Sequence, residues 1–154
     1  MAFAPVWRQP AAAKFWLAAG PMAAKSSLPE PLTLAHLKTR ADFLAAARDI
    51  RKVVGAITLE LTPTPPIKRR EGEVRIGITA SRKIGNAVAR NRAKRRLRAA
   101  AREALPLSGR PGHDYVLVAR GGILTRDFQA LLGDVTAAMA AAHAKLDARQ
   151  GGRT

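Results

Sequence analysis

The chain has 154 residues, of which 27 are Lys or Arg and 11 are Asp or Glu, so its formal net charge at pH 7 is +16. Apolar residues make up 47% of the sequence, but 32 positions are alanine, which predicts one domain with a modest core. The lack of cysteine excludes disulfides, thiolate zinc sites and cysteine nucleophiles, and no apolar run is long enough for a membrane helix. The large positive charge favours nucleic acid or another polyanion as partner.

The amino-terminal segment differs in composition from the rest of the chain. Its first 29 residues contain four prolines and no acid, and no convincing cleavage pattern of small residues follows its short apolar stretch. We therefore expect residues 1–31 to be a disordered extension, within which Met22 is an alternative start. One domain is expected over residues 32–148, followed by a disordered tail over residues 149–154.

The first half of the domain predicts a helix and then strands. Thr39 and Asp42 have the spacing of a capping box, in which both side chains bind backbone amides, so a short helix is expected from there to about Arg48. Residues 56–61 alternate as a strand does, and residues 50–54 form a candidate second strand.

Residues 62–72 contain three prolines and a run of three cations, which indicates a basic loop rather than a continued strand. The clearest alternation follows over residues 73–80. A helix over residues 87–105, a strand over residues 114–119 and a helix beginning near Thr125 complete the pattern. Larger apolar residues recur along this last helix at three- and four-residue spacing, so it is expected to cover one sheet face. This order predicts a small layered α+β or α/β domain.

Most of the net charge lies in one segment. Residues 74–102 contain ten cations and no acid, namely Arg75, Arg82, Lys83, Arg90, Arg92, Lys94, Arg95, Arg96, Arg98 and Arg102. On a helix, the apolar residues of this segment form a narrow edge and the cations cover the other side. Like charges four residues apart destabilise a helix by about 0.2–0.5 kcal/mol per pair. A phosphate-binding surface explains this arrangement better than a solvated face without a partner.

Two asparagines and a glycine accompany these cations. Gly85 has the freedom to adopt a positive φ between strand and helix, and Asn86 is suited to cap the helix. Asn91 is a neutral donor and acceptor between two arginines, suited to a sugar hydroxyl, a base edge or a metal-bound water.

These residues resemble a known family. The stretch reads Arg75-Ile76-Gly77-Ile78-Thr79-Ala80-Ser81-Arg82-Lys83-Ile84-Gly85-Asn86-Ala87-Val88-Ala89-Arg90-Asn91-Arg92-Ala93-Lys94-Arg95-Arg96-Leu97-Arg98. It is similar to the signature of the bacterial ribonuclease P protein subunit, including the Arg-Asn-Arg motif at residues 90–92. The resemblance extends over about residues 32–145.

The resemblance implies a three-layer α/β sandwich with a small central sheet, in the order α-β-β-(β)-α-β-α. It also implies a left-handed strand-helix-strand crossover around the basic helix, against the usual right-handed rule. The family's proteins bind a catalytic RNA, which hydrolyses the phosphodiester that joins the 5′ leader to precursor tRNA. Mg²⁺ is expected as cofactor, bound mainly through the RNA, and no catalytic residue or metal ligand is expected in the protein.

The resemblance also implies two sets of contacts. The catalytic RNA is expected to contact Arg82, Lys83, Asn86, Arg90, Asn91, Arg92, Lys94, Arg95, Arg96 and Arg98. The leader is expected in a cleft between the first helix and the sheet, with Phe43, Arg48, Ile57 and Leu59 as candidates and Phe43 stacking on a base. The protein alone is expected to be a monomer in the bacterial cytoplasm.

Three alternatives to this interpretation differ in how well they fit the sequence. A protein-only nuclease needs a paired acid and base, whereas His36, His113 and His143 belong to three separate elements. A helix-turn-helix module lacks its first helix, since residues 74–80 are predicted as a strand. A ribosomal or other structural RNA-binding protein fits the composition equally well, and only the motif disfavours it.

Overall fold

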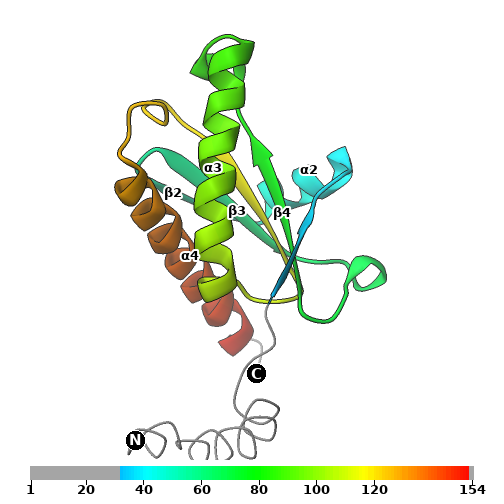
Figure 1. The fold of residues 1–154 in the computed structure, drawn as a ribbon. Helices are drawn as coiled ribbons and strands as arrows, with labels where there is room; N and C mark the ends of the chain where they lie inside the picture. Colours follow the sequence, from blue (N-terminus) through cyan, green and yellow to red (C-terminus); the bar gives the residue numbers. More distant parts are fainter. Residues whose placement is uncertain (1–31, 153–154) are drawn as a thin grey trace, which may run out of the picture. The chain divides into compact units, whose positions relative to one another are not determined.

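The computed structural model describes residues 32–152, which form a five-stranded sheet with helices on both faces (Figure 1). The strands are β1 (Thr33–His36), β2 (Ile50–Val54), β3 (Ile57–Pro63), β4 (Glu73–Thr79) and β5 (His113–Ala119). The helices are α2 (Arg40–Arg48), α3 (Ala87–Ser108) and α4 (Phe128–Gly151), with short 3-10 turns η2 (Pro66–Lys68) and η3 (Arg82–Ile84). The strand order is β1-β4-β5-β3-β2.

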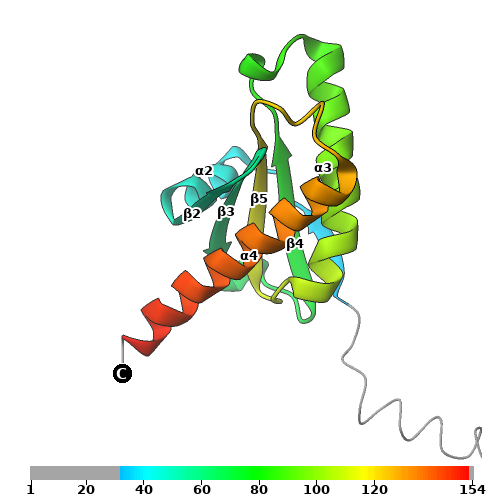
Figure 2. The same ribbon diagram turned by 90° about the vertical axis from the view of Figure 1, so that its left-hand side faces the viewer.

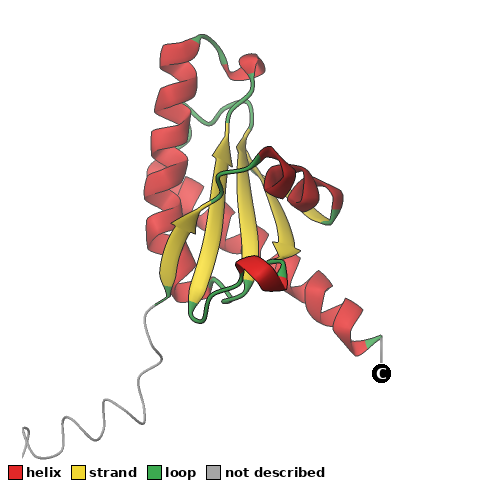
Figure 3. Cartoon of the chain, turned by 90° about the vertical axis from the view of Figure 1, so that its right-hand side faces the viewer, coloured by secondary structure: helices red, strands yellow, loops and turns green. Residues whose placement is uncertain are grey.

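The sheet separates two unequal layers of helix. Figure 2 shows α3 and α4 packed across one face, and Figure 3 shows α2 and η2 on the other. β4 and β5 are adjacent and parallel, and α3 connects them. Seen with α3 in front of the sheet and β4 running upward, the chain returns to β5 on the left (Figure 1), which is the expected left-handed crossover.

The main core lies between the sheet and the two long helices. The alternating residues Ile57, Leu59 and Leu61 of β3 are at most 1% exposed there. The narrow apolar edge of α3, which includes Ala93 and Leu97, faces the same core, as does the predicted stripe of α4. The core buries many small side chains, because α3 approaches the sheet through alanines.

The layer under α2 is thinner. Its apolar cluster contains Leu37, Ala46 and Val116, with Phe43 and Val118 partly buried against it. Thr58 and Glu60, on the alternate positions of β3, are also buried, although they lie on the face opposite the main core. Both faces of the central strands are therefore covered.

The structure differs from the sequence prediction at β1 and at both ends of α4. β1 was not predicted, because a four-residue strand shows almost no periodicity; it pairs in parallel with β4 at the edge of the sheet. α4 begins at Phe128 rather than near Thr125, since Asp127 accepts hydrogen bonds from the amides of Gln129 and Ala130. The same helix continues to Gly151, so residues 149–151 of the predicted disordered tail are helical.

The capping box at α2 is half correct. Thr39 is the N-cap and its Oγ1 accepts a hydrogen bond from the Asp42 amide at 3.4 Å. The Asp42 carboxylate turns inward and binds cations instead of a backbone amide. The expected extension over residues 1–31 lies outside the described residues. No helix within residues 32–152 has the length and apolarity needed to cross a membrane.

Candidate nucleic-acid interface

The start of α3 projects beyond the end of the sheet together with η3 (Figure 1 and Figure 3). The Asn86 side chain caps the helix, with its Oδ1 accepting a hydrogen bond from the Ala89 amide at 2.9 Å. Gly85, at φ 145°, adopts a backbone conformation that side chains disfavour, as expected from the sequence. Arg82 and Lys83 in η3 are thereby placed, exposed, beside the first turn of the helix.

Eight of the ten cations between residues 74 and 102 have free side chains. None of them makes a side-chain hydrogen bond or ion pair with any residue between 32 and 152. We call this set the α3 cations: Arg82, Lys83, Arg90, Arg92, Lys94, Arg95, Arg98 and Arg102. Asn91 lies among them and is exposed. Within the described part of the chain, the positive charge of this helix is not neutralised by the protein.

Arg96 is an exception to the predicted set. Its Nη1 donates to the carbonyl oxygens of Ile123 and Leu124 at 2.7 and 2.8 Å, and its Nη2 donates to the carbonyl of Arg126. The guanidinium therefore binds the loop between β5 and α4. Both terminal nitrogens of Arg96 already bind protein carbonyls, and its contact with RNA stays a prediction.

Arg75, the other exception, lies in a buried ionic cluster beneath α2. Its Nη2 binds Asp42 Oδ2 at 2.5 Å, and its Nε lies 3.5 Å from Asp114 Oδ1. Lys68 Nζ, from η2, reaches Asp42 Oδ1 at 2.9 Å, and Thr64 donates a hydrogen bond to Asp114 at 2.7 Å. The cluster joins α2, the β3–β4 loop, β4 and β5 into one unit.

The two carboxyl groups of this cluster titrate differently. Burial alone would raise the pKa of Asp42, but hydrogen bonds from Thr39 and Lys68 and the charge of Arg75 lower it below its usual value. Burial dominates at Asp114 and raises the pKa of that carboxyl, although Thr64 and Arg75 oppose the shift.

The cleft expected between α2 and the sheet contains a shallow hollow of about 510 Å³. It is lined by Arg40, Phe43, Leu44 and Thr79. The partly exposed Phe43 ring packs directly over Gly77 of β4, where an added Cβ would lie 2.8 Å from Phe43 Cζ. A glycine is needed there because any larger residue would displace the ring. Phe43 lines this hollow between α2 and the sheet, and its contact with the leader stays a prediction. The other three lining residues were not predicted.

Two of the residues predicted for the leader cleft do not line this hollow. Ile57 and Leu59 are 0% and 1% exposed and face the main core, on the opposite side of the sheet from α2. Alternation was correctly identified in β3, but the wrong set of alternate residues was assigned to the cleft. Thr58 and Glu60 are the residues that face α2, and Arg48 is exposed at the end of that helix.

The part of the chain that the structure describes contains no cluster of potential metal ligands. Within residues 32–152, no three His, Asp or Glu side chains are grouped closely enough to hold a metal ion. Asp42 and Asp114, the carboxylates of the buried cluster, already bind the guanidinium of Arg75.

Comparison with known proteins agrees with the geometry. The sequence model of the family described as Ribonuclease P matches residues 33–143. The chain is 47% identical over 121 residues to the ribonuclease P protein component of Caulobacter vibrioides, covering 77% of this chain and 78% of that protein. It is 49% identical over 112 residues to that of Ruegeria pomeroyi, covering 70% and 86%.

The fold also matches a solved structure. The RNase P protein of Staphylococcus aureus superimposes with a TM-score of 0.56 at 21% identity, covering 70% of this chain and 94% of that one. This likeness concerns the fold, whereas the sequence matches concern the family. The family match covers the turn and the helix that carry the α3 cations. The chain therefore belongs to the ribonuclease P protein component family.

Proposed function

We propose that the chain binds the catalytic RNA of ribonuclease P through the α3 cations, with Asn86 and Asn91 among them. The observation that carries this proposal is the set of eight cations without a protein partner among residues 32–152. They lie on one helix and the turn before it. The turn and the start of the helix project beyond the sheet (Figure 1), and Arg98 and Arg102 lie farther along the helix, beside β1 and β4. Such a surface releases counterions when it meets RNA phosphates, and this release supplies most of the affinity.

The leader of precursor tRNA is assigned to the α2 side of the sheet. The partly exposed Phe43 ring offers a stacking surface there, and stacking on an aromatic ring contributes about 1–3 kcal/mol per base. Arg40 lines the same hollow, and Arg48 is exposed at the far end of α2. Both cations are suited to leader phosphates. The two contacts together would hold a single strand along the helix.

The chemical step is assigned to the RNA. The three histidines lie in separate elements: His36 is in β1, His113 begins β5 and His143 is buried in α4. His143 shares a hydrogen bond with the Tyr115 hydroxyl, so it does not form an acid and base pair with another histidine. The protein contributes binding and position, and any Mg²⁺ is held by the RNA. We propose that the protein acts as a monomer in the bacterial cytoplasm.

Single substitutions test the RNA contact. Arg90→Ala, Arg92→Ala and Arg95→Ala should each weaken binding to the catalytic RNA and lower the slope of log affinity against log salt by about 1. Filter binding or fluorescence anisotropy at several salt concentrations measures both quantities. If all three variants bind as the wild type does, the assignment of this surface is wrong.

Cleavage assays test the division of labour. Purified protein treated with nuclease should not cleave precursor tRNA at any magnesium concentration, whereas adding the catalytic RNA should restore turnover. Turnover by the RNA-free protein would overturn the assignment of the chemical step to RNA. Sequencing of the RNA that co-purifies from cells identifies the partner directly and separates this proposal from a ribosomal role.

A further inference from the structure

The start of α2 is attached to β4 at two adjacent residues. Asp42 Oδ2 accepts a hydrogen bond from Arg75 Nη2 at 2.5 Å. The ring of the next residue, Phe43, packs over Gly77. Side chains alternate between the two faces of a strand, so Arg75 and Gly77 belong to the same face of β4. Two consecutive residues of the helix therefore meet two successive positions on one face of the strand.

The next position on that face of β4 is part of the hollow assigned to the leader. Thr79 lines this hollow together with Arg40, Phe43 and Leu44 of α2. The strand supplies one lining side chain and the helix supplies the other three. The shape of the hollow therefore depends on where α2 lies over β4, because a shift or rotation of the helix moves these three side chains together.

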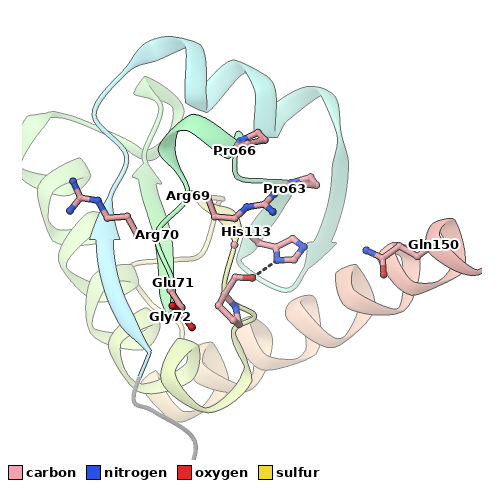
Figure 4. A pocket seen from close by; sticks show the side chains of 10 residues that line it. Pro63, Pro66, Arg69, Arg70, Glu71, Gly72, His113 and Gln150 are labelled. Atoms are coloured by element: carbon pink, nitrogen blue, oxygen red, sulfur yellow. Dashed lines mark hydrogen bonds between the residues drawn. The ribbon is translucent and has the colours of Figure 1, made fainter.

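Asp42 also connects α2 to the turn η2. Its Oδ1 accepts a hydrogen bond from Lys68 Nζ at 2.9 Å, and its Oδ2 accepts one from Thr39 Oγ1 at 2.7 Å. Figure 4 shows η2, marked by Pro66, next to α2. The Asp42 side chain is only 8% exposed, and both of its oxygens bind donors. Donors from β4, η2 and the helix N-cap thus hold one carboxylate, and they fix the helical turn that carries it.

Apolar packing beneath α2 is limited. The helix has nine residues, of which only Asp42 and Ala46 are buried. The buried apolar cluster under it contains Leu37, Ala46 and Val116. Contacts between small apolar side chains are not directional, whereas charge-assisted hydrogen bonds have a defined length and direction. The ionic contacts of Asp42 therefore set the position of the helix more narrowly than its apolar contacts do.

The Arg75 side of this contact has a cost that stability alone does not explain. Its side chain is 9% exposed, and its Nη1 is the one buried side-chain nitrogen or oxygen within the described residues that lacks a hydrogen-bond partner. A buried ion pair is often no more stabilising than apolar side chains of the same volume, and in some proteins it specifies a single arrangement. The pair of Arg75 and Asp42 is suited to that role.

We propose that Asp42 is a positioning residue for leader binding. Through its bond to Arg75 it fixes α2 over β4, so that the Phe43 ring lies where a leader base stacks on it. Asp42 is 6% exposed, so it acts through the helix that carries it and not by contact with RNA. This inference rests on the proposed function, because it takes the leader to bind beside α2.

Asp42→Asn tests this role in the full chain, reconstituted with the catalytic RNA. Asparagine offers one acceptor oxygen, and its amide group places a donor against the cations that bind the second oxygen of Asp42. Affinity for a precursor tRNA with its leader should fall about fivefold or more, as expected for the loss of one stacked base. The KM should rise and kcat should stay unchanged. The loss of a negative charge alone would strengthen RNA binding, so the expected effect has the opposite sign.

Arg75→Lys changes the other partner of the same contact. It keeps the positive charge, but a single ammonium group cannot bind Asp42 and Asp114 as the planar guanidinium does. The same loss of affinity for the leader is expected. Asp147→Asn is the matched control, since it makes the same chemical change in the exposed ion pair with Arg110 on α4, across the sheet from α2 (Figure 2). The control should bind precursor tRNA as the wild type does.

Two further measurements separate positioning from a general loss of structure. Affinity for the same tRNA without a leader and affinity of the protein for the catalytic RNA should stay at the wild-type level in both variants. A loss confined to the leader in either variant supports the inference. It is overturned if both variants bind the leader as the wild type does, or if both lose affinity for all three RNAs equally.

Phe43→Ala, measured alongside, tests the proposed leader site itself. Its affinity for precursor tRNA should fall only when the leader is present. If Phe43→Ala shows this loss and the Asp42 and Arg75 variants do not, the positioning role is wrong and the leader site stands. If Phe43→Ala binds the leader as the wild type does, the proposed leader site is overturned together with the inference.

Discussion

Two neighbouring arginines on α3 show how differently this chain uses the same side chain. Arg96 donates to three carbonyls of the loop between β5 and α4 and holds that loop against the helix. Arg95, one residue earlier, is exposed and has no partner among the described residues. Successive helical positions are about 100° apart, so one side chain reaches the protein and the other faces outward.

The same division applies to the whole chain. Arg75, Arg110, Arg126 and Arg149 bind carboxylates, and these bonds connect elements distant in sequence or secure a loop. The α3 cations have no such acceptor within reach in the described structure. One group of cations stabilises the fold, and the other adds repulsion to it. Repulsion between like charges that no carboxylate of the fold offsets indicates a surface that binds a polyanion.

The largest predicted effect concerns Arg75, because it is the most buried cation of the first group. Arg75→Ala removes the guanidinium that the buried carboxylates of Asp42 and Asp114 share, which should lower the free energy of unfolding by about 3–5 kcal/mol. Urea denaturation of the protein without RNA measures this loss. Arg98→Ala is the control, since Arg98 is half-buried but unpaired, and it should change stability by at most about 0.5 kcal/mol. Equal losses of stability in Arg75→Ala and Arg98→Ala would contradict the distinction between cations that stabilise the fold and the α3 cations.

A smaller effect is expected within the pair Arg95 and Arg96. Arg96→Ala removes three hydrogen bonds to the β5–α4 loop and should cost about 1–3 kcal/mol of stability. Arg95→Ala should cost almost nothing in stability and should weaken RNA binding. Thermal unfolding and RNA affinity are measured on both variants. Arg96→Ala should show the larger loss of stability, and Arg95→Ala should show the loss of RNA affinity. A larger stability loss for Arg95→Ala than for Arg96→Ala would contradict the comparison.

His143 extends the comparison of paired and unpaired cations to a titratable group, because protonation of its buried ring would create a positive charge inside the protein. The buried Tyr115 hydroxyl accepts a hydrogen bond from the Arg110 amide at 2.8 Å and shares another with His143 Nε2 at 2.7 Å. Burial raises the pKa of Tyr115 to about 12, so the hydroxyl stays protonated. Burial, together with the charges of Arg110 and His113, lowers the pKa of His143 below its ordinary 6.5, although Asp147 opposes the shift.

The sign of the pH dependence follows from that lowered pKa. Below pH 6.5 the unfolded chain binds a proton at His143 before the folded chain does, so stability falls as the pH decreases and then levels off below the folded pKa. Unfolding free energies measured between pH 8 and pH 5 should show this fall. His143→Gln should remove part of the dependence, and an unchanged pH profile would show that His143 does not contribute it.

Much of the fold could be predicted because strong periodicity identifies long elements. The α4 stripe and the alternation of β4 agree with the structure, and the family resemblance supplied the left-handed crossover that no pattern contains. β1 was missed since its pairing with β4 depends on residues about 40 positions away. Local patterns carry no information about such a partner.

The candidate site was predicted less completely for a related reason. The motif identified the cations of α3, but only the path of the β5–α4 loop shows that Arg96 is occupied. Alternation gave two sets of residues in β3, and which set faces α2 depends on how the helices distribute over the sheet. Gly77, between Arg75 and Thr79, is the residue of β4 that could have indicated the face covered by α2. A glycine within a strand often marks a close approach by another group, here the Phe43 ring.

The smallest predicted effect on stability has the opposite sign to the others. Lys94 has like charges four residues away on both sides, Arg90 and Arg98, and none of the three has a described anionic partner. Lys94→Ala removes two repulsive pairs and should raise the free energy of unfolding by about 0.4–1 kcal/mol at low salt. The gain should shrink as salt is added, because salt screens exposed charges. The same substitution should weaken RNA binding, since it removes a phosphate contact. A stability gain combined with an affinity loss is what a residue retained for binding rather than for folding produces, and a stability loss in urea denaturation at low salt would place Lys94 with Arg75 and Arg96 instead.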